Sequence, residues 1–550
     1  MLYLVIIFLS AFLLFQVQPL IAKLILPLFG GGAAIWTACL LFFQAFLLLG
    51  YLYAHCLTQL KNLRTQVIIH SVLLMVSLSV LPIALGEFKL SAALGLGLSV
   101  TLGSEVNSPL IDILLMLVIS VGLPYFLLSA TGPLVQRWLS YNDENALPYK
   151  LYSLSNIGSL LALLSYPFIF EPQFSLHNQL LYWSLGYGSF VFILSLLCLR
   201  LFKSSPTLLI KKTPQENGVE DVKFDIFLWI GLSSVGVILL VSITNAMTQN
   251  IPPIPFLWIL PLCLYLLTFI VSFHSLKWYV RWYWFALFAI SSFAGILMFF
   301  IGSQFGIVSQ VVIYSLILLS SCMVCHGELV KLKPSTERLT LFYLNMSLGG
   351  FLGSAFVAFI AQQVFSQFYE FPLALFSVYV LFSLCLYLSR NKRSRNKQSR
   401  NKQLKNKNEK QIKKTSYLLN GASIVSLLSL LLFFNYLNTL FAHNTVASSR
   451  NFYGILSIKD VEINGNTERR LIDGSTSHGT QSQNPELEHI PMSYYRADTG
   501  VALALDHLFP MMNIKVGLIG LGAGTLAAYS RPGDQYTFYE LNPNVEAMAW

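Results

Sequence analysis

Residues 1–25 read MLYLVIIFLSAFLLFQVQPLIAKLI, an almost uninterrupted apolar run with neither a basic start nor a small-residue cleavage site. A removable signal peptide carries both features, so this stretch is predicted to remain in the protein as a first membrane span. The whole chain has the same character, because 55% of its 550 residues are hydrophobic and only 11% are charged. That composition excludes a soluble globular protein and predicts a multi-span helical membrane protein.

Apolar segments of spanning length recur along the chain, and each must be helical because lipid offers no partners to backbone polar groups. The predicted fold class is therefore a mostly α, polytopic membrane bundle of six, six and one spans, followed by an incomplete α/β domain. The predicted segments are a first six-helix half at residues 1–202, a cytoplasmic loop at 203–224, a second six-helix half at 225–389, a basic disordered loop at 390–415, an additional span at 416–437 and the α/β domain at 442–550.

A short internal repeat favours the division into two halves. The segments YSLSNIGSLLA, which begins at Tyr152, and YLNMSLGGFLG, which begins at Tyr343, share the tyrosine and a later glycine. The copies lie about 190 residues apart, as expected for parallel repeats of a two-half, transporter-like bundle. Small residues in both copies let helices approach closely where lipid gives no hydrophobic drive.

Basic residues decide the predicted orientation. They gather in alternate loops and in residues 390–414, which places those loops and the N-terminus in the cytoplasm. A span at residues 416–437 then places the C-terminal domain outside the cytoplasm. The basic tract either binds anionic lipid head groups or is a solvated loop. Because the net charge of +10 is concentrated there, a nucleic-acid partner is excluded and the lipid bilayer is the expected partner.

Residues 514–541, IKVGLIGLGAGTLAAYSRPGDQYTFYEL, predict a nucleotide-binding strand–turn–helix–strand unit. An apolar strand enters the turn Gly520-x-Gly522-x-Gly524, and a second strand ends at Glu540. Glycines let the backbone approach a ligand closely, and an acid at the end of the second strand accepts ribose hydroxyls. The glycine spacing favours a single adenosyl ligand over NAD, although helix-capping glycines can mimic the pattern. Upstream, alternating runs predict a β-hairpin at residues 452–474.

Several polar residues within apolar segments are further candidates. Cys322-Met-Val-Cys325-His326 matches the covalent haem pattern, but its place at the end of an apolar span favours local packing, and no haem and no metal are expected. Asp112, His326 and Glu328 are either parts of a translocation path or proton relay, or locally paired groups.

Asn245, Gln249 and the prolines of 252–255, which precede Trp258, suggest a broken helix end. A broken helix can line a substrate site, but an interfacial loop with an aromatic anchor explains the same residues equally well.

Taken together, the motifs resemble the membrane-bound spermidine-synthase-like family, in which a major-facilitator-like bundle is fused to an aminopropyltransferase-type domain. The resemblance rests on FQVQPLIAKLILPLFGG, PFLWILPLCLYLLTF, CHGELVKLKP and FYLNMSLGG in the bundle. In the C-terminal part it rests on RNFYGIL, HGTQ, YY, and VGLIGLGAGTLAAY followed by FYELNP. It implies an inner (plasma) membrane location in a bacterium and transfer of an aminopropyl group from decarboxylated S-adenosylmethionine to putrescine or a related small amine.

The resemblance also implies roles for individual residues. The glycines Gly520, Gly522 and Gly524 would pack against the adenosyl group, and Glu540 would hold the ribose. The residues expected beside the sulfonium and the amine are Gln481, Tyr494 or Tyr495, and Asp473.

The catalytic acid of this family is expected after residue 550, so the catalytic residue is unknown and the chain as given is expected to be inactive. Two other functions stay open: a transporter-like protein with a ligand-sensing C-terminal domain, and a membrane methyltransferase that uses S-adenosylmethionine.

Overall fold

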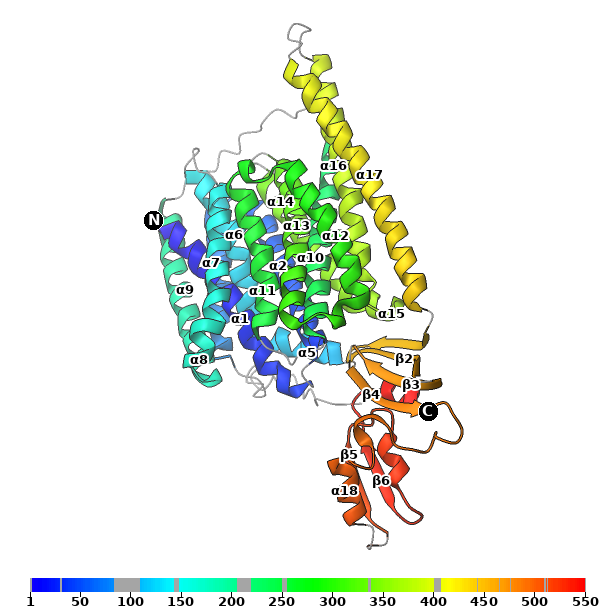
Figure 1. Cartoon of the computed structure of the whole chain (residues 1–550). Coiled ribbons are helices and arrows are strands. Elements are labelled where there is room, and N and C mark those ends of the chain that lie inside the picture. The colour runs from blue at the N-terminus through cyan, green and yellow to red at the C-terminus, as the bar shows by residue number, and fades with distance from the viewer. Residues whose placement is uncertain are drawn as a thin grey trace.

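The computed structural model describes residues 2–29, 32–83, 109–142, 148–204, 219–249, 255–334, 338–399, 407–442, 444–463, 465–474, 476–508, 511 and 513–549. The chain is mostly helical, with a small antiparallel sheet near its C-terminal end (Figure 1). Thirteen helical segments of the described chain are long and apolar enough to cross a membrane. These segments indicate a multi-pass membrane protein.

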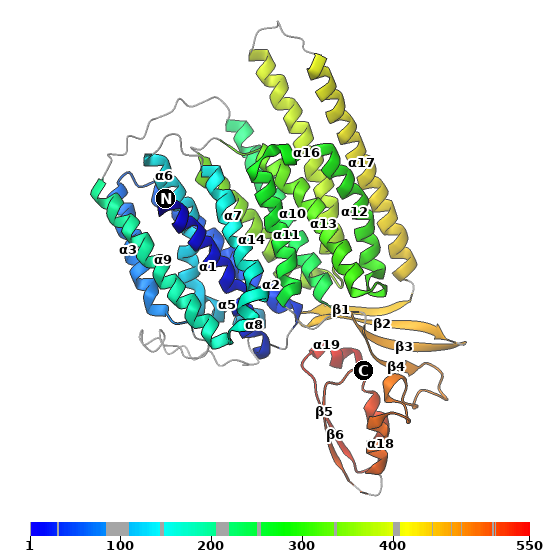
Figure 2. The ribbon, with the colours of Figure 1, turned by 60° about the vertical axis from the view of Figure 1, so that its left-hand side comes forward.

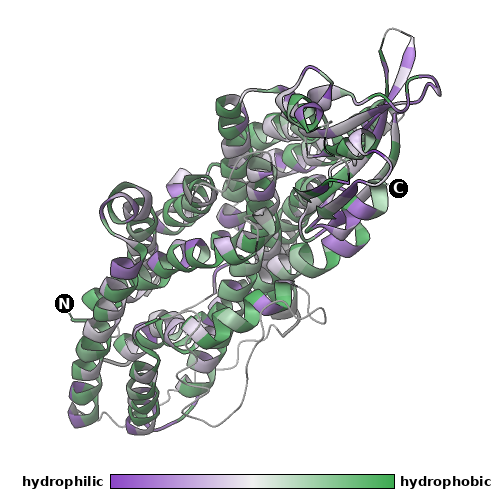
Figure 3. Cartoon of the chain, turned by 90° about the horizontal axis from the view of Figure 1, so that it is seen from below, coloured by the Kyte–Doolittle hydropathy of each residue, from purple (hydrophilic) through white to green (hydrophobic). Residues whose placement is uncertain are grey.

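The bundle contains two similar sets of helices. The first set is α1 (Leu2–Ile25), α2 (Ala33–Thr58), α3 (Leu63–Ser77), α5 (Pro109–Leu117), α6 (Leu123–Asn142), α7 (Pro148–Ser165), α8 (Glu171–Gln173) and α9 (Leu176–Ser204). The second set is α10 (Val219–Thr248), α11 (Pro255–His274), α12 (Arg281–Ile301), α13 (Ile307–Lys331), α14 (Leu339–Ala355), α15 (Gln362–Val364) and α16 (Glu370–Ser399). Seen from below, most bundle ribbon is coloured hydrophobic (Figure 3).

The two sets pack in the same pattern. Helix α1 packs on α7 in the first set, and α10 packs on α14 in the second. The two sets contact each other where α2 packs on α14 and α11 packs on α7. The repeat glycines occupy equivalent contacts. A Cβ on Gly158 would lie 3.0 Å from the Phe8 carbonyl of α1, and one on Gly349 would lie 2.4 Å from the Ile230 carbonyl of α10. Both glycines therefore permit close helix contact, as the sequence repeat predicts.

Helix α17 (Lys407–Ala442) lies outside the two sets, against α12 and α16. The ends of α16 and α17 that carry the basic tract project beyond one end of the bundle, whereas the C-terminal strands lie at the opposite end (Figure 2). The tract was expected to be a disordered loop at residues 390–415, but helix continues to Ser399 and resumes at Lys407. Lys, Arg and Gln are good helix formers, so a helix already nucleated by a span extends through them.

The C-terminal domain has two sheets. Strands β1 (Thr445–Asn451), β2 (Gly454–Ile463), β3 (Asn466–Asp473) and β4 (Thr476–Ser482) form an antiparallel sheet in sequence order. The expected hairpin is the β2–β3 pair, and Asn464 of its turn lies outside the described residues. After η9 (Ser493–Tyr495) and α18 (Gly500–His507), strands β5 (Lys515–Ile519) and β6 (Gln535–Tyr539) pair in parallel.

The connection between β5 and β6 is the 3₁₀ turn η10 (Thr525–Tyr529) rather than the expected short helix. A short helix, α19 (Pro543–Ala549), follows β6. Its Val545 packs with Leu456 of β2 and Leu471 of β3, and Leu521 and Ala523 of the glycine turn pack against the same cluster. The glycine turn is thus held against the antiparallel sheet.

Candidate functional site

A cavity of about 310 Å³ lies where the C-terminal domain meets the bundle. Its walls combine the glycine turn, the ends of β3 and β6, and the segment between α1 and α2. The polar side chains in the lining are those of Tyr453, Asp473, His478, Glu540 and Asn542, and Gly520 and Gly522 of the glycine turn also line the cavity. Phe29 and Gly32 of the bundle close the cavity on the membrane side, so the site is shared between the two parts.

The glycine turn adopts backbone conformations that other residues rarely reach. Gly520, Gly522 and Gly524 have φ angles of 89°, 55° and 70°, in the region where a side chain is strained. A Cβ on Gly522 would lie 2.7 Å from the carbonyl oxygen of His478, and that same oxygen accepts a hydrogen bond from the Ala523 N–H. The turn therefore needs glycine both for its own geometry and for its contact with β4.

Glu540 lies beside this turn, as the strand–turn–strand pattern predicts. One carboxylate oxygen accepts the N–H of Leu521 at 2.8 Å, and the other accepts the N–H of Asn542 at 2.8 Å. These bonds fix the carboxylate at the mouth of the turn. A carboxylate oxygen has two lone pairs, so each oxygen keeps one acceptor position for a ligand hydroxyl.

Asp473 ends strand β3 and lines the same cavity. Burial raises the pKa of its carboxyl above the ordinary value of 3.8, and the nearby His478 opposes that shift. A carboxylate that is partly removed from water gains more from a cation partner than an exposed one does. Asp473 is therefore suited to hold an ammonium group.

The other residues singled out in the sequence lie outside the lining of this cavity. Gly524 caps the far end of the turn. The Gln481 side chain is exposed and donates to the Glu488 carbonyl at 3.4 Å. Tyr494 donates to the Ser477 carbonyl at 3.4 Å, and the backbone carbonyl of Tyr495 accepts the Tyr529 hydroxyl at 2.5 Å. The structure thus brings together Gly520, Gly522, Glu540 and Asp473, but not these four.

A buried ion pair fixes the C-terminal domain to the bundle. The Arg450 guanidinium donates to both carboxylate oxygens of Glu370 at 2.8 Å, and also to the Gln367 carbonyl at 2.9 Å. The side chains of Arg450 and Glu370 are 3% and 0% exposed. Arg450 begins the RNFYGIL motif, so the motif contains a docking residue as well as a strand.

Within the bundle, the CHGE segment is a packed structural element. The thiols of Cys322 and Cys325 are buried, and His326 stacks on Phe269 with ring centroids 3.7 Å apart. Glu328 is also buried, and both of its oxygens accept hydrogen bonds from the Arg281 guanidinium at 2.6 Å. These contacts fit the local-packing interpretation of the segment.

The proline-rich stretch of 252–255 is described only from Pro255 onwards, so Pro252 and Pro253 lie outside the described residues. Asn245, which precedes it, accepts a hydrogen bond from Thr37 of α2 at 3.0 Å. Asp112 is buried in the first turn of α5.

Sequence reasoning missed two residues of the interface, His478 and Arg450. His478 belongs to the HGTQ segment, but the family resemblance predicts that Gln481 is the ligand-binding residue of that segment. Arg450 lacked a signal, because its partner Glu370 lies 80 residues earlier in the chain. Among the described residues, no group of three His, Cys, Asp or Glu side chains is arranged to hold a metal ion.

Comparison with known proteins adds no identification. A scan against protein-family models finds no match for this chain. A search of curated proteins also finds no match.

Proposed function

We propose that this chain is a membrane-bound protein of the spermidine-synthase-like, aminopropyltransferase type. Its C-terminal domain binds decarboxylated S-adenosylmethionine in the cavity that the glycine turn and Asp473 line. The observation that carries the proposal is the position of Glu540. Its carboxylate is fixed at the mouth of the glycine turn by two backbone N–H groups and faces the cavity. That is the position from which an acid binds the ribose in nucleotide-binding sheets.

The residues present fit such a ligand. Gly520, where a Cβ would meet nothing within 4 Å, leaves space for an adenosyl group against the backbone, and Glu540 would accept its ribose hydroxyls. Asp473, which lines the same cavity, would bind the ammonium end of the amine. When bound, the ligand supplies a carbon activated by the neighbouring sulfonium, and the protein's task is to place the amine nitrogen next to it.

The acid that removes a proton from the amine is not assigned. Glu540 is engaged by two backbone donors, and Asp473 is the other acidic side chain among the described lining residues. A general base must lie within hydrogen-bond reach of the proton it accepts. Asp473 is therefore the first residue to substitute when transfer is assayed.

A binding experiment on the purified full chain tests the proposal. Decarboxylated S-adenosylmethionine and S-adenosylmethionine are titrated separately by calorimetry into wild type, Gly522→Ala and Glu540→Gln. Tighter binding of the decarboxylated ligand, weakened at least tenfold by both substitutions, is expected. Tighter binding of S-adenosylmethionine would favour the methyltransferase alternative, and absence of binding by both would refute an adenosyl site.

Gly465→Ala is the matched control. Gly465 also has a positive φ, 80°, but a Cβ there would meet nothing within 4 Å. It lies in the β2–β3 turn, away from the cavity, so its strain should leave ligand affinity unchanged. Spermidine formation from putrescine and the decarboxylated ligand is then measured as a separate readout of transfer.

A further inference from the structure

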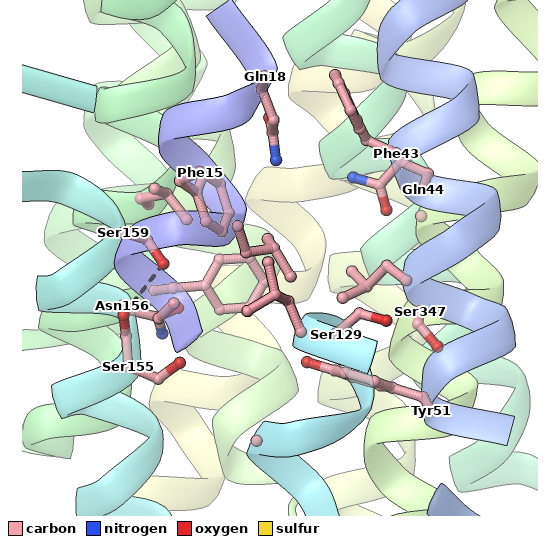
Figure 4. A pocket seen from close by; sticks show the side chains of 18 of the residues that line it. Phe15, Gln18, Phe43, Gln44, Tyr51, Ser129, Ser155, Asn156, Ser159 and Ser347 are labelled. Atoms are coloured by element: carbon pink, nitrogen blue, oxygen red, sulfur yellow. Dashed lines mark hydrogen bonds between the residues drawn. The ribbon is translucent and has the colours of Figure 1, made fainter. Parts of the chain in front are cut away.

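The bundle contains a second cavity, of about 130 Å³, at the interface between the two sets of helices. Helices α1, α2, α6 and α7 line it from one side and α10, α11 and α14 from the other. Figure 4 shows the amides of Gln18, Gln44 and Asn156 and the hydroxyls of Tyr51 and Ser347 around this space. The cavity shares no lining residue with the C-terminal domain's site.

Two polar atoms in the cavity wall are unsatisfied. Among the described residues, Asn156 Nδ2 and Ser233 Oγ have no hydrogen-bond partner, although their side chains are only 7% and 2% exposed. A buried donor without a partner is unfavourable, and native proteins normally satisfy such groups. Both atoms belong to residues that line the same cavity, one from each set of helices. A molecule that reached both atoms would give each of them a hydrogen-bond partner.

The repeat contributes to both sides of the cavity. Asn156 and Ser347 hold the same position in the two copies of the repeat, and both line the cavity. Tyr152 and Ser159 line it from the first copy, and Gly350 lines it from the second. The repeated motif therefore forms a ligand-sized space where its copies meet.

Aromatic stacks lie at both ends of the cavity. Towards the C-terminal domain, Trp36 of α2 stacks on Trp258 of α11 with centroids 5.4 Å apart. These residues precede the lining residues Leu40 and Leu262 by one helical turn. At the other end, Tyr152 of α7, itself a lining residue, stacks on Tyr343 of α14.

The lining also indicates the charge of the occupant. None of the described residues in the wall is Asp, Glu, Lys, Arg or His. Burying an ion without a partner of opposite charge is costly, so this wall favours an uncharged occupant. Flat aromatic surfaces favour a planar molecule. The volume is close to that of an engineered protein cavity of about 150 Å³ that binds benzene.

We propose that this central cavity is a binding site for a small, planar, uncharged molecule with an amide-like hydrogen-bonding edge, which Asn156 Nδ2 and Ser233 Oγ recognise from the two sets of helices. The site takes an uncharged ligand, so it is distinct from any site for a polyamine cation. It is independent of the adenosyl site, and either can be refuted alone.

Benzamide and benzamidinium are suitable probes because they have the same shape and differ in charge. Each is titrated against the full chain in lipid nanodiscs, with binding followed by saturation-transfer NMR. Benzamide is expected to bind at least tenfold more tightly than benzamidinium. Equal or tighter binding of benzamidinium, or no saturable binding of benzamide, would overturn the proposal.

Asn156→Leu keeps the approximate size of the side chain and removes the unsatisfied donor, so it should weaken benzamide binding at least tenfold. Asn420→Leu is the matched control, because Asn420 of α17 also carries an unsatisfied buried atom but lies outside the cavity. It should leave binding unchanged. If Asn156→Leu does not fold, Ser233→Ala removes the second unsatisfied atom, and unchanged benzamide affinity in that variant would contradict the proposal.

Discussion

The rings of Tyr152 and Tyr343 stack with their centroids 4.9 Å apart and an interplanar angle of 19°. Each tyrosine begins one copy of the internal repeat, so the two copies meet at the interface between the two sets of helices. The Trp36–Trp258 stack joins the two sets at the other end of the central cavity. We therefore expect that opening the cavity at either end requires one of these aromatic pairs to separate.

Removing one ring should open the cavity towards the C-terminal domain. Trp36→Ala deletes a buried ring and leaves space between α2 and α11. A cysteine introduced by Ser347→Cys, in the cavity wall, should then react at least tenfold faster with a membrane-impermeant maleimide applied from that side. Trp138→Ala, which removes an equally buried tryptophan outside the cavity, is the control. Equal rates in the two variants would contradict closure by Trp36.

The repeat glycines should differ in their tolerance of alanine. Gly349→Ala places a methyl group 2.4 Å from the Ile230 carbonyl, and Gly158→Ala places one 3.0 Å from that of Phe8. Such overpacking costs about 1–3 kcal/mol, with Gly349 expected at the upper end. Gly188→Ala meets nothing within 4 Å in α9, so better helix propensity should stabilise the protein slightly. Thermal unfolding in detergent ranks the three variants, and equal midpoints would refute close packing at Gly349.

Features that depend on neighbouring residues could be predicted from the sequence, whereas contacts between residues far apart in the chain could not. The membrane helices were predictable because each one satisfies its own backbone hydrogen bonds. The β5–turn–β6 unit was predictable because the glycines and the pattern of apolar residues are local sequence signals. The repeat pointed to Asn156 and Ser347, but their shared cavity required the packing of α7 against the second set of helices. The ion pair of Arg450 with Glu370 depends on the position of β1 at the end of α17, and no local sequence pattern predicts that position.

The ion pair that docks the C-terminal domain should be sensitive to loss of one partner. Arg450→Met leaves the buried Glu370 carboxylate without its cation, and breaking a buried pair costs about 3–5 kcal/mol. Faster proteolysis of the region after Leu440 and faster hydrogen exchange in β1 are expected. Arg469→Met, which breaks the partly exposed pair with Asp460 in the same sheet, should cost at most about 1 kcal/mol. Comparable effects of the two substitutions would contradict a docking role.

The pH dependence of the C-terminal domain should reveal the burial of Asp473. Its raised pKa means that the folded state holds the proton more tightly than the unfolded state does, so stability falls as pH rises above 3.8. Asp473→Asn should therefore slow hydrogen exchange in β3 at neutral pH and have little effect at about pH 3.

Asp534→Asn should show the opposite sign. The hydrogen bond from Arg531 lowers the pKa of the Asp534 carboxyl, so its contribution to stability is present at neutral pH and is lost as pH falls. The substitution should accelerate local exchange at neutral pH, with the difference disappearing in acid. For Asp473, a wild-type stability of β3 that increases as pH rises above 3.8 would contradict the prediction of a raised pKa.

The two ends of the bundle should be accessible from opposite sides of the membrane. Cys56, at the end of α2, is the exposed cysteine among seven, and the other six are buried. A second accessible thiol introduced by Asp498→Cys would lie in the C-terminal domain, where the side chain is 68% exposed. An impermeant maleimide applied to sealed inner-membrane vesicles of one orientation should label one of these thiols and spare the other. Because Lys and Arg favour the cytoplasmic side, Cys56 should be the one labelled from the cytoplasm. Labelling of both from one face would remove α17 as a crossing helix, and it would place the candidate adenosyl site on the same side as the basic tract.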